Sequence, residues 1–354
     1  MFETTSGGPL CFWSGYTLGM LLRLPASAAA AARAHASHLH DYARTYRRRV
    51  TVLDRQLELW FLGATRADLV PLLFGERYCA ILYRGVLVDP GSILMRRSLE
   101  RHLERTTAGS VTAVTATHAH EEHVGNLEWA ANRTAAPLYL PDVLASRLRS
   151  PQRLPIARAF AFGRPRGLTC PVSDTAAGIP IGDGRLEVIP APGHSGEHVA
   201  LFDPRQRVLL VGDTFIGAYF SAANAETDGH AWLRTLRRLL DLDFDLMVEG
   251  HGRVHTLRRD VPAIPGVVVR EDPRLIMAAK LRFLTRLARR ARAARDRGLS
   301  VNRAVAEAFP WQQRPSWDRL FADELARVTS CGEFSRHKLV KSFLDPATAG
   351  PRST

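Results

Sequence analysis

The sequence is poor in cysteine, with four in 354 residues, and no two of them stand at the C-x-x-C spacing that is typical of cysteine zinc sites. Neither such a site nor a disulfide framework is indicated. The sequence also lacks an apolar run of about 18 residues, so we expect no membrane-spanning helix. No internal repeat is present, and the amounts of glycine and proline are ordinary, which excludes a fibrous or wholly disordered chain.

Acidic residues are fewer than basic ones: 35 Asp and Glu oppose 48 Lys and Arg, which gives a formal net charge of +13. An excess of this size is compatible with a polyanionic partner such as nucleic acid, but net charge reports on non-specific binding rather than on fold. Arg carries most of the excess in a chain rich in Ala, Arg and Leu, so a bias in composition explains it equally well. Nucleic acid is therefore an alternative partner and not the favoured one.

The first 49 residues differ from the rest of the chain. Residues 9–22 are apolar and are followed by Ala-Ser-Ala at 26–28, which resembles a signal-peptide cleavage site, but Glu3 is the only charge before them and a signal peptide needs a basic start. The six Arg among the first 50 residues leave an organelle transit peptide as a further alternative. Because residues 26–46 are rich in alanine, we predict that residues 1–49 form a helical extension of a cytoplasmic protein.

Residues 50–262 are predicted to form an α/β domain. Short runs of β-branched and apolar residues alternate there with helix-forming stretches. The strands that the sequence marks best lie at residues 78–83, 111–116, 186–190, 199–202, 208–211 and 246–249.

Residues 263–354 are predicted to form a helical C-terminal subdomain, because the strand pattern stops before them. A long basic helix is expected over residues 272–297. One apolar stripe should run along it, formed by Leu275, Ile276, Ala279, Leu281, Leu284 and Leu287. Shorter helices are expected at residues 301–309, 317–328 and 335–343. We interpret Trp311, Trp317 and Phe343 as residues that cover a substrate cleft or form the face of a homodimer.

Candidate metal ligands gather in one short segment. His118, His120, Glu122 and His123 follow directly after the strand predicted at 111–116. In a loop that leaves a strand, alternate and adjacent residues project in different directions, so His118 and His120 can point to one centre while Glu122 and His123 point to another. This pattern predicts separate ligands for two metal ions.

Three later segments each bring one more candidate ligand. His194, Asp213 and His251 stand beside glycine, each at or just after the end of a predicted strand. Loops at the strand ends of a rigid scaffold commonly carry catalytic groups, and zinc takes imidazole and carboxylate ligands together. We therefore expect these side chains to converge on the segment that holds the first four.

The order and spacing of these residues resemble the metallo-β-lactamase superfamily and, within it, the glyoxalase-II-like branch; the pattern is His118-x-His120-x-Glu122-His123, then His194, Asp213 and His251. An Asp89-Pro-Gly turn after a hydrophobic strand adds to the resemblance, which covers roughly residues 50–260. The resemblance implies a four-layer αβ/βα sandwich of two sheets with helices outside. It also implies two Zn²⁺ per chain, with Fe or Mn as alternatives. His118, His120 and His194 would bind the first ion, Glu122, His123 and His251 the second, and Asp213 would bridge them.

One position departs from the superfamily signature, which has Asp where this chain has Glu122. The extra methylene moves the carboxylate, so the second site is expected to be weaker, to prefer another divalent metal or to be lost. We interpret Glu122 as the ligand and Glu121 as a residue that either faces solvent or supports a ligand from behind. His198 falls on no ligand position and is expected to pack beside the site.

The resemblance implies hydrolysis by a metal-bound hydroxide, which Glu122 or Asp213 would orient and whose proton either could receive. Asp213 argues against a true β-lactamase, in which another residue takes this position. It favours a small-molecule ester or thioester substrate such as an acyl-CoA, a hydroxyacyl thioester or a lactone. The residues after Asp213 lack the Cys-Gly-Lys type of segment that would meet glutathione, so glutathione is not predicted. The alternatives are a phosphodiesterase or nuclease, which a basic helix would suit, and a non-catalytic metal sensor.

Overall fold

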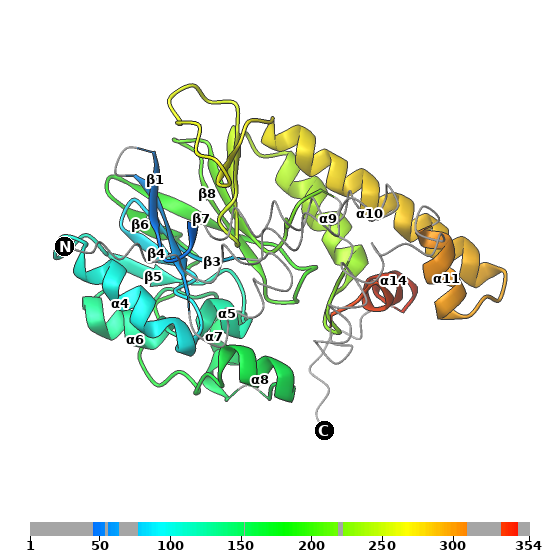
Figure 1. Cartoon of the computed structure of the whole chain (residues 1–354), viewed down its shortest axis with the longest axis horizontal. Coiled ribbons are helices and arrows are strands. Elements are labelled where there is room, and N and C mark those ends of the chain that lie inside the picture. Colours follow the sequence, from blue (N-terminus) through cyan, green and yellow to red (C-terminus); the bar gives the residue numbers. More distant parts are fainter. Residues whose placement is uncertain are drawn as a thin grey trace, which may run out of the picture.

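The computed structural model describes residues 45–53, 56–63, 77–151, 153–218, 222–309 and 334–345. Most of the predicted extension at 1–49 and the helix predicted at 317–328, together with Trp311 and Trp317, lie outside the described residues. The described residues form two mixed β-sheets with helices on their outer faces (Figure 1). The division of the chain at residues 50 and 263 stays a prediction.

The first sheet has the strand order β1-β2-β3-β4-β5. Its strands are β1 (Arg49–Leu53), β2 (Leu57–Leu62), β3 (Tyr78–Tyr83), β4 (Val86–Val88) and β5 (Ala113–Thr115). A two-residue turn joins β3 to β4, and its residues Arg84 and Gly85 have positive φ values of 47° and 87°. A tight hairpin requires positive φ at both positions, because this backbone matches the twist of the strands. After β4 the chain passes through η1 (Ile93–Met95) and α4 (Arg96–Glu104) and returns as β5, parallel to β4.

The second sheet has the strand order β12-β11-β10-β9-β8-β7-β6. Its strands are β6 (Ile179–Ile181), β7 (Gly184–Pro190), β8 (Val199–Asp203), β9 (Val208–Gly212), β10 (Leu246–Glu249), β11 (Val254–Thr256) and β12 (Val268–Val269). Strands β9 and β10 are parallel neighbours, with α9 (Gly229–Leu240) between them in the chain. The carboxyl ends of β9 and β10 therefore meet at one edge of the sheet.

Side chains alternate between the two faces of each strand, and the apolar ones form three layers. One layer lies between the two sheets, and one lies on the outer face of each sheet. In β2, Leu59 and Phe61 face the second sheet, whereas Trp60 and Leu62 face the opposite way, because successive side chains of a strand point to opposite faces. The inner layer joins β2 and β3 of the first sheet to β8, β9 and β10 of the second. The outer face of the first sheet is covered by α4, α6 (Leu127–Thr134) and α7 (Asp142–Arg149), and that of the second by α9 and the C-terminal helices. This arrangement confirms the predicted αβ/βα sandwich.

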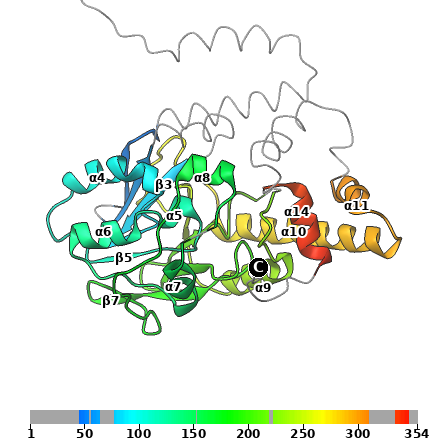
Figure 2. The same ribbon diagram turned by 90° about the horizontal axis from the view of Figure 1, so that it is seen from below.

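The C-terminal part contains α10 (Pro273–Asp296), α11 (Val301–Ala308) and α14 (Arg336–Leu344). Figures 1 and 2 show α10 extending beyond the sheets, with α11 near its far end. Helix α10 begins where Asp272 accepts the N–H groups of Arg274 and Leu275, at 2.8 and 3.2 Å, and Pro273 occupies the first turn. No helix in the described part of the chain has the length and apolar character needed to cross a membrane.

The predicted apolar stripe of α10 is wrong at one position, because Leu275 is 67% exposed. The buried side of the helix instead follows Met277, Lys280, Leu284 and Leu287, which recur every three or four residues. Lys280 is fully buried with its Nζ 5.2 Å from the centre of the Trp232 ring, and burial lowers its pKa to about 7.

Candidate metal centre

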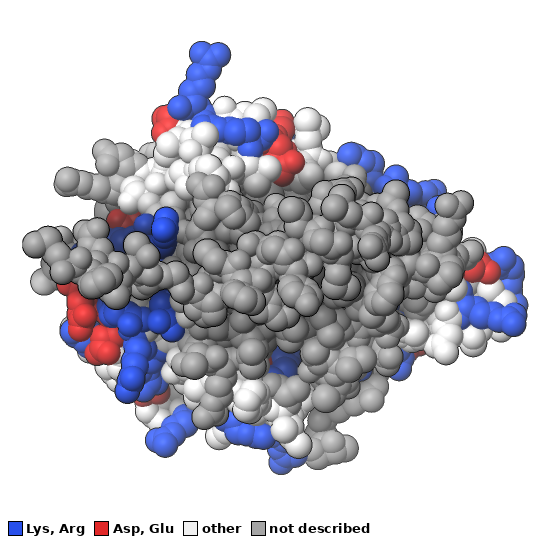
Figure 3. Space-filling view, viewed as in Figure 1, with Lys and Arg blue, Asp and Glu red and all other residues white. Residues whose placement is uncertain are grey.

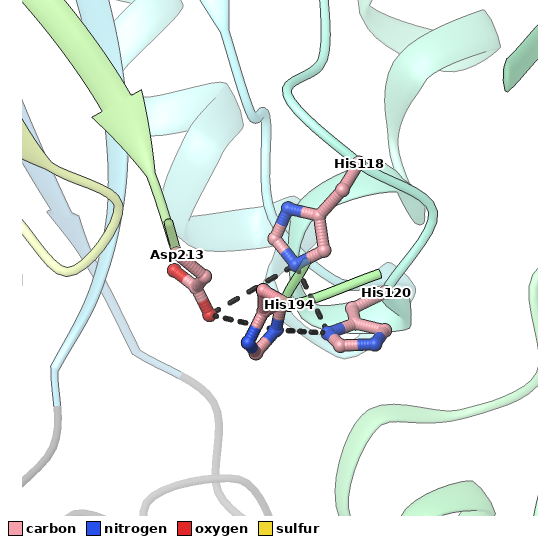
Figure 4. A group of neighbouring side chains, drawn as sticks. All are labelled: His118, His120, His194 and Asp213. Carbon is pink, nitrogen blue, oxygen red and sulfur yellow. Dashed lines mark hydrogen bonds and ion pairs between the residues drawn. The ribbon is translucent and has the colours of Figure 1, made fainter. Parts of the chain in front are cut away.

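The first group of candidate ligands comes from three loops at one edge of the sandwich. His118 and His120 follow β5, His194 follows β7 and Asp213 follows β9. Figure 4 shows the four side chains pointing toward one another. The Nδ1 atom of His120 lies 2.9 Å from His118 Nε2 and 3.1 Å from His194 Nε2. Their ligand atoms and a carboxylate oxygen of Asp213 all lie within 4.8 Å of one another, which is close enough to share one ion.

The second group consists of His123, Asp213 and His251. Asp213 Oδ2 lies 3.7 Å from His123 Nε2 and 3.4 Å from His251 Nε2. The same oxygen lies 3.9 Å from His118 Nε2 and 3.7 Å from His194 Nε2. One carboxylate oxygen therefore stands between the two groups, as a bridging ligand would.

Hydrogen bonds behind the imidazoles determine which ring nitrogen faces the centre. His123 Nδ1 donates to Asp89 Oδ2 at 3.0 Å. Thr117 also donates its hydroxyl to Asp89, so its Oγ1, 2.9 Å from His118 Nδ1, accepts the N–H of that ring. His251 Nδ1 donates to a backbone carbonyl, at 2.6 Å. Ligating histidines are usually held in this way, with the second N–H bound to an acceptor.

The donor set fits a metal ion on physical grounds. His120 Nε2 lies 2.6 Å from the Glu226 carboxylate, which can only accept a hydrogen. When His120 is neutral, His118 Nε2 and His120 Nδ1 therefore face each other at 2.9 Å as two lone pairs, an arrangement that a cation stabilises. The buried atoms Glu122 Oε2, His123 Nε2 and Asp213 Oδ1 form no hydrogen bond within the described part of the chain. Buried polar atoms without partners are costly, and binding an ion would satisfy them.

Charges and burial at the centre favour the metal-binding ionisation states of Asp213, His118 and His194. Burial alone would raise the pKa of Asp213, but the imidazoles of His251 and His123 outweigh burial and hold its pKa well below the usual range. Burial and neighbouring imidazoles lower the pKa of His194 to about 3 and that of His118 well below its ordinary value. For His123, burial is outweighed by the carboxylates of Asp213 and Asp89, which raise its pKa. An incoming metal would displace that proton.

Glu122 and Glu121 both lie in α5 (Glu121–Val124), beside Arg158 of α8 (Ile156–Phe162). Glu122 is not in either ligand group, and its Oε2 lies 3.8 Å from Arg158. Its role as a ligand stays a prediction. The solvent-facing alternative for Glu121 is wrong: the residue is fully buried, and Arg158 donates two hydrogen bonds to its carboxylate at 2.6 and 2.7 Å. A buried carboxylate needs such a partner, and α8 supplies it.

His198 lies directly behind the site. Its Nε2 accepts the backbone N–H of Asp213 at 3.1 Å, and its ring stacks on His118 with centres 4.7 Å apart. Burial and the neighbouring His194 lower the pKa of His198 to about 3. His198 thus supports Asp213 and His118 from behind and belongs to neither ligand group.

Sequence reasoning missed an ion-pair network that contacts His120. Glu226 Oε1 lies 2.6 Å from His120 Nε2, and Arg147 binds both Glu226 and Glu197. Glu197 carried a weak signal, because it lies in the same glycine-rich segment as His194. Glu226 and Arg147 are 79 residues apart and carried no local signal.

Replacing Glu122 with Asp is expected to preserve or raise activity and to increase the metal content toward two ions per chain. The shorter carboxylate restores the residue of the superfamily signature and moves away from Arg158, which lies beside Glu122 in this chain. Metal content measured by mass spectrometry of the native protein checks the expectation, with initial rates recorded on the same samples. Loss of all activity in this variant would contradict the assignment of Glu122 to the second ion.

Comparison with known proteins shows which proteins this chain is similar to. A family model described as the metallo-beta-lactamase superfamily matches residues 82–251. The alpha subunit of a 2,4-dinitroanisole O-demethylase from Nocardioides sp. (strain JS1661) is 31% identical over 169 residues, which cover 46% of this chain and 46% of that protein. Metallo-beta-lactamase domain-containing protein 1 of Xenopus laevis is 30% identical over 152 residues, which cover 42% of this chain and 53% of that protein. The chain thus spans about half the length of the curated relatives it matches.

Among solved structures, a metallo-beta-lactamase from Pontibacter korlensis is 18% identical with a TM-score of 0.46, and the match covers 67% of this chain and 98% of that one. The family match shows that residues 82–251 are similar to the metallo-beta-lactamase superfamily, whose members are mostly metal-dependent hydrolases, and the two-sheet fold with its cluster of candidate ligands agrees with this similarity.

Proposed function

We propose that this chain is a metal-dependent hydrolase of the glyoxalase-II-like branch that cleaves a small-molecule ester or thioester. The observation that carries the proposal is the position of Asp213 Oδ2 between two groups of buried imidazoles. His118, His120 and His194 would hold one ion and His123 and His251 the other, with Glu122 as a further candidate for the second. Divalent ions held there, Zn²⁺ or alternatively Fe or Mn, would lower the pKa of a bound water and polarise a carbonyl oxygen.

The chain's own groups would orient the reactants. Asp213 Oδ2 lies between the two groups of imidazoles, so this oxygen would accept a hydrogen bond from a water held there. His198 holds the backbone of Asp213, and β9 and β10 place Asp213 beside His251. Such rigid placement keeps the carboxylate directed at the position where the water must attack.

Charges around the site support an ester over a phosphodiester substrate. In the part of the chain that the structure describes, Arg147 and Arg158 contact the acidic groups near His120, and both are bound to glutamates. Neither guanidinium is therefore available to a substrate phosphate in this arrangement. A nuclease would need cations directed at its phosphate groups.

The basic helix α10 gives only indirect support to a nucleic-acid substrate. Figure 3 shows basic side chains along the edge where α10 runs in Figure 1. Within α10, Arg282, Arg286 and Arg289 are exposed. Other arginines of α10 have structural roles: Arg274 and Arg295 donate to backbone carbonyls of neighbouring segments, at 2.5 to 2.8 Å. A solvated outer face with structural arginines explains the helix without a polyanion.

Initial rates on a panel of substrates test the proposal. The panel contains an acyl-CoA thioester, a lactone, an activated phosphodiester and 2,4-dinitroanisole, the last because a relative is named for its O-demethylation. We expect thioester or lactone turnover that chelation abolishes and that Zn²⁺, Fe²⁺ or Mn²⁺ restores. Turnover of the phosphodiester alone would make α10 a substrate surface, and metal binding without any turnover would indicate a sensor; either result would overturn the proposal.

A further inference from the structure

The ligand His120 is held from behind by a carboxylate that lies far away in the sequence. His120 is the residue just before α5, and its Nδ1 faces His118 and His194. Its Nε2 lies 2.6 Å from Glu226 Oε1, so this nitrogen carries the hydrogen and donates it to the carboxylate. The hydrogen bond leaves Nδ1 as the lone pair that faces the centre.

Glu226 is itself held in place. Its Oε2 accepts a hydrogen bond from Arg147 Nη2 at 2.5 Å, and Arg147 Nη1 donates to Glu197 Oε2 at 2.7 Å. The other oxygen of Glu197 accepts the backbone N–H of Ala119 at 3.1 Å. The network therefore contacts the loop of His120 at two points, through Glu226 at His120 and through Glu197 at Ala119.

The network also reaches the loop of His194. Glu197 Oε1 accepts the hydroxyl of Ser195, the residue after His194, at 3.0 Å. Thr227, next to Glu226, donates its hydroxyl to the carbonyl of His194 at 3.1 Å. Two loops that each bring a ligand are thereby joined through one arginine of α7.

We propose that Glu226 is a positioning residue for the first metal site, which fixes the ring orientation and tautomer of His120 and is itself held by Arg147. This proposal depends on the proposed function only in one respect, namely that the site binds a metal ion. Partners of this kind commonly contribute about 10–100-fold to metal affinity. Because His120 belongs to the first group alone, the effect should fall on the site of His118, His120 and His194 and not on that of His123 and His251.

The chain offers a matched control in His255. Its Nδ1 lies 2.6 Å from Glu271 Oε1, and the Glu271 side chain is 34% exposed, against 30% for Glu226. His255 belongs to neither ligand group among the described residues. Glu271→Ala therefore breaks an equivalent hydrogen bond between a carboxylate and an imidazole without touching a ligand.

The test compares the Zn²⁺ affinity of the full chain and of three variants, by competition with a chromophoric chelator. We expect Glu226→Ala to weaken the first Zn²⁺ by about 10–100-fold, and Glu226→Gln by less, because its amide oxygen can still accept the hydrogen of Nε2. Glu271→Ala should stay within about twofold of the unsubstituted chain. The visible spectrum of the protein with one equivalent of Co²⁺ should change in Glu226→Ala and not in Glu271→Ala.

The outcomes separate this proposal from the proposed function. Failure of the unsubstituted chain to bind Zn²⁺, Fe²⁺ or Mn²⁺ would refute the metal-dependent function itself. Binding by the unsubstituted chain with an unchanged affinity and Co²⁺ spectrum in Glu226→Ala would overturn the role of Glu226 alone. Unfolding temperatures of the metal-free proteins show whether each variant is folded, and Glu226→Gln keeps the shape of the side chain if Glu226→Ala is not.

Discussion

Replacing Asp213 with Asn is expected to lower kcat/KM by about 10²–10⁴-fold, the range for loss of a carboxylate that orients or deprotonates the nucleophile. The metal content should fall as well, because Asp213 Oδ2 is the atom common to both ligand groups. Asn keeps the shape of the side chain but loses the negative charge that lies 3.4 Å from His251 and 3.7 Å from His123. Steady-state kinetics and metal analysis of the purified variant measure the two effects.

The control for Asp213 is Asp203, another buried aspartate at the end of a strand of the second sheet. Asp203 accepts hydrogen bonds from Tyr83 and Arg84, at 2.9 and 3.0 Å, and belongs to no ligand group. Asp203→Asn should lower the unfolding temperature while the folded protein keeps its metal content and its kcat/KM. If Asp213→Asn keeps both metals and loses less than about tenfold in kcat/KM, Asp213 does not bridge the ions.

Replacing Gly250 with Ala is expected to lower kcat/KM by about 10²-fold or more, which is the effect of a small misplacement of a reacting group. A Cβ at position 250 would lie 2.4 Å from Asp213 Oδ1 and 3.1 Å from the carbonyl carbon of Gly212. Gly250 also donates its N–H to the carbonyl of Gly212, at 3.0 Å, so the backbone is held in place. The carboxylate of Asp213 must therefore move, and overpacking of this kind costs about 1–3 kcal/mol of stability in addition.

Gly196→Ala is the matched control for Gly250→Ala. A Cβ at Gly196 meets no atom within 4 Å, and the glycine lies in the neighbouring loop that also carries His194. We expect this variant to keep the activity and the metal affinity of the unsubstituted chain. Equal activity of both alanine variants would show that the carboxylate tolerates displacement, against the proposed role of Asp213.

The convergence of the imidazole and aspartate candidate ligands could be predicted from sequence because each of their segments follows a hydrophobic strand. Asp213 and His251 meet because β9 and β10 are parallel and end at the same edge of the sheet. The loop of His118 joins this edge through a hydrogen bond of 2.8 Å from Val199 N–H to the Thr117 carbonyl. Strand ends are marked by local patterns, so sequence reasoning could find them.

The charged residues that hold the candidate ligands and their loops in place could not be predicted in the same way. Arg158 pairs with Glu121 across 37 positions, and Arg147 pairs with Glu226 across 79. No periodicity joins such residues, since only the packing of α7 and α8 beside the ligand loops brings them together. Sequence reasoning left the burial of Glu121 open and missed the exposure of Leu275 for a related reason. The side of a helix that is covered depends on the elements packed beside it.

By itself the sequence determined most of the longer strands and helices and the seven candidate ligand positions, because alternation and turn residues act over a few neighbours along the chain. Only the tertiary structure decided which nitrogen of each imidazole faces the centre, that Asp213 stands between two ligand groups, and that glutamates hold the nearby arginines. These features depend on atoms from separate loops lying within about 3–4 Å of one another, and such distances are set by the packing of the two sheets and their helices.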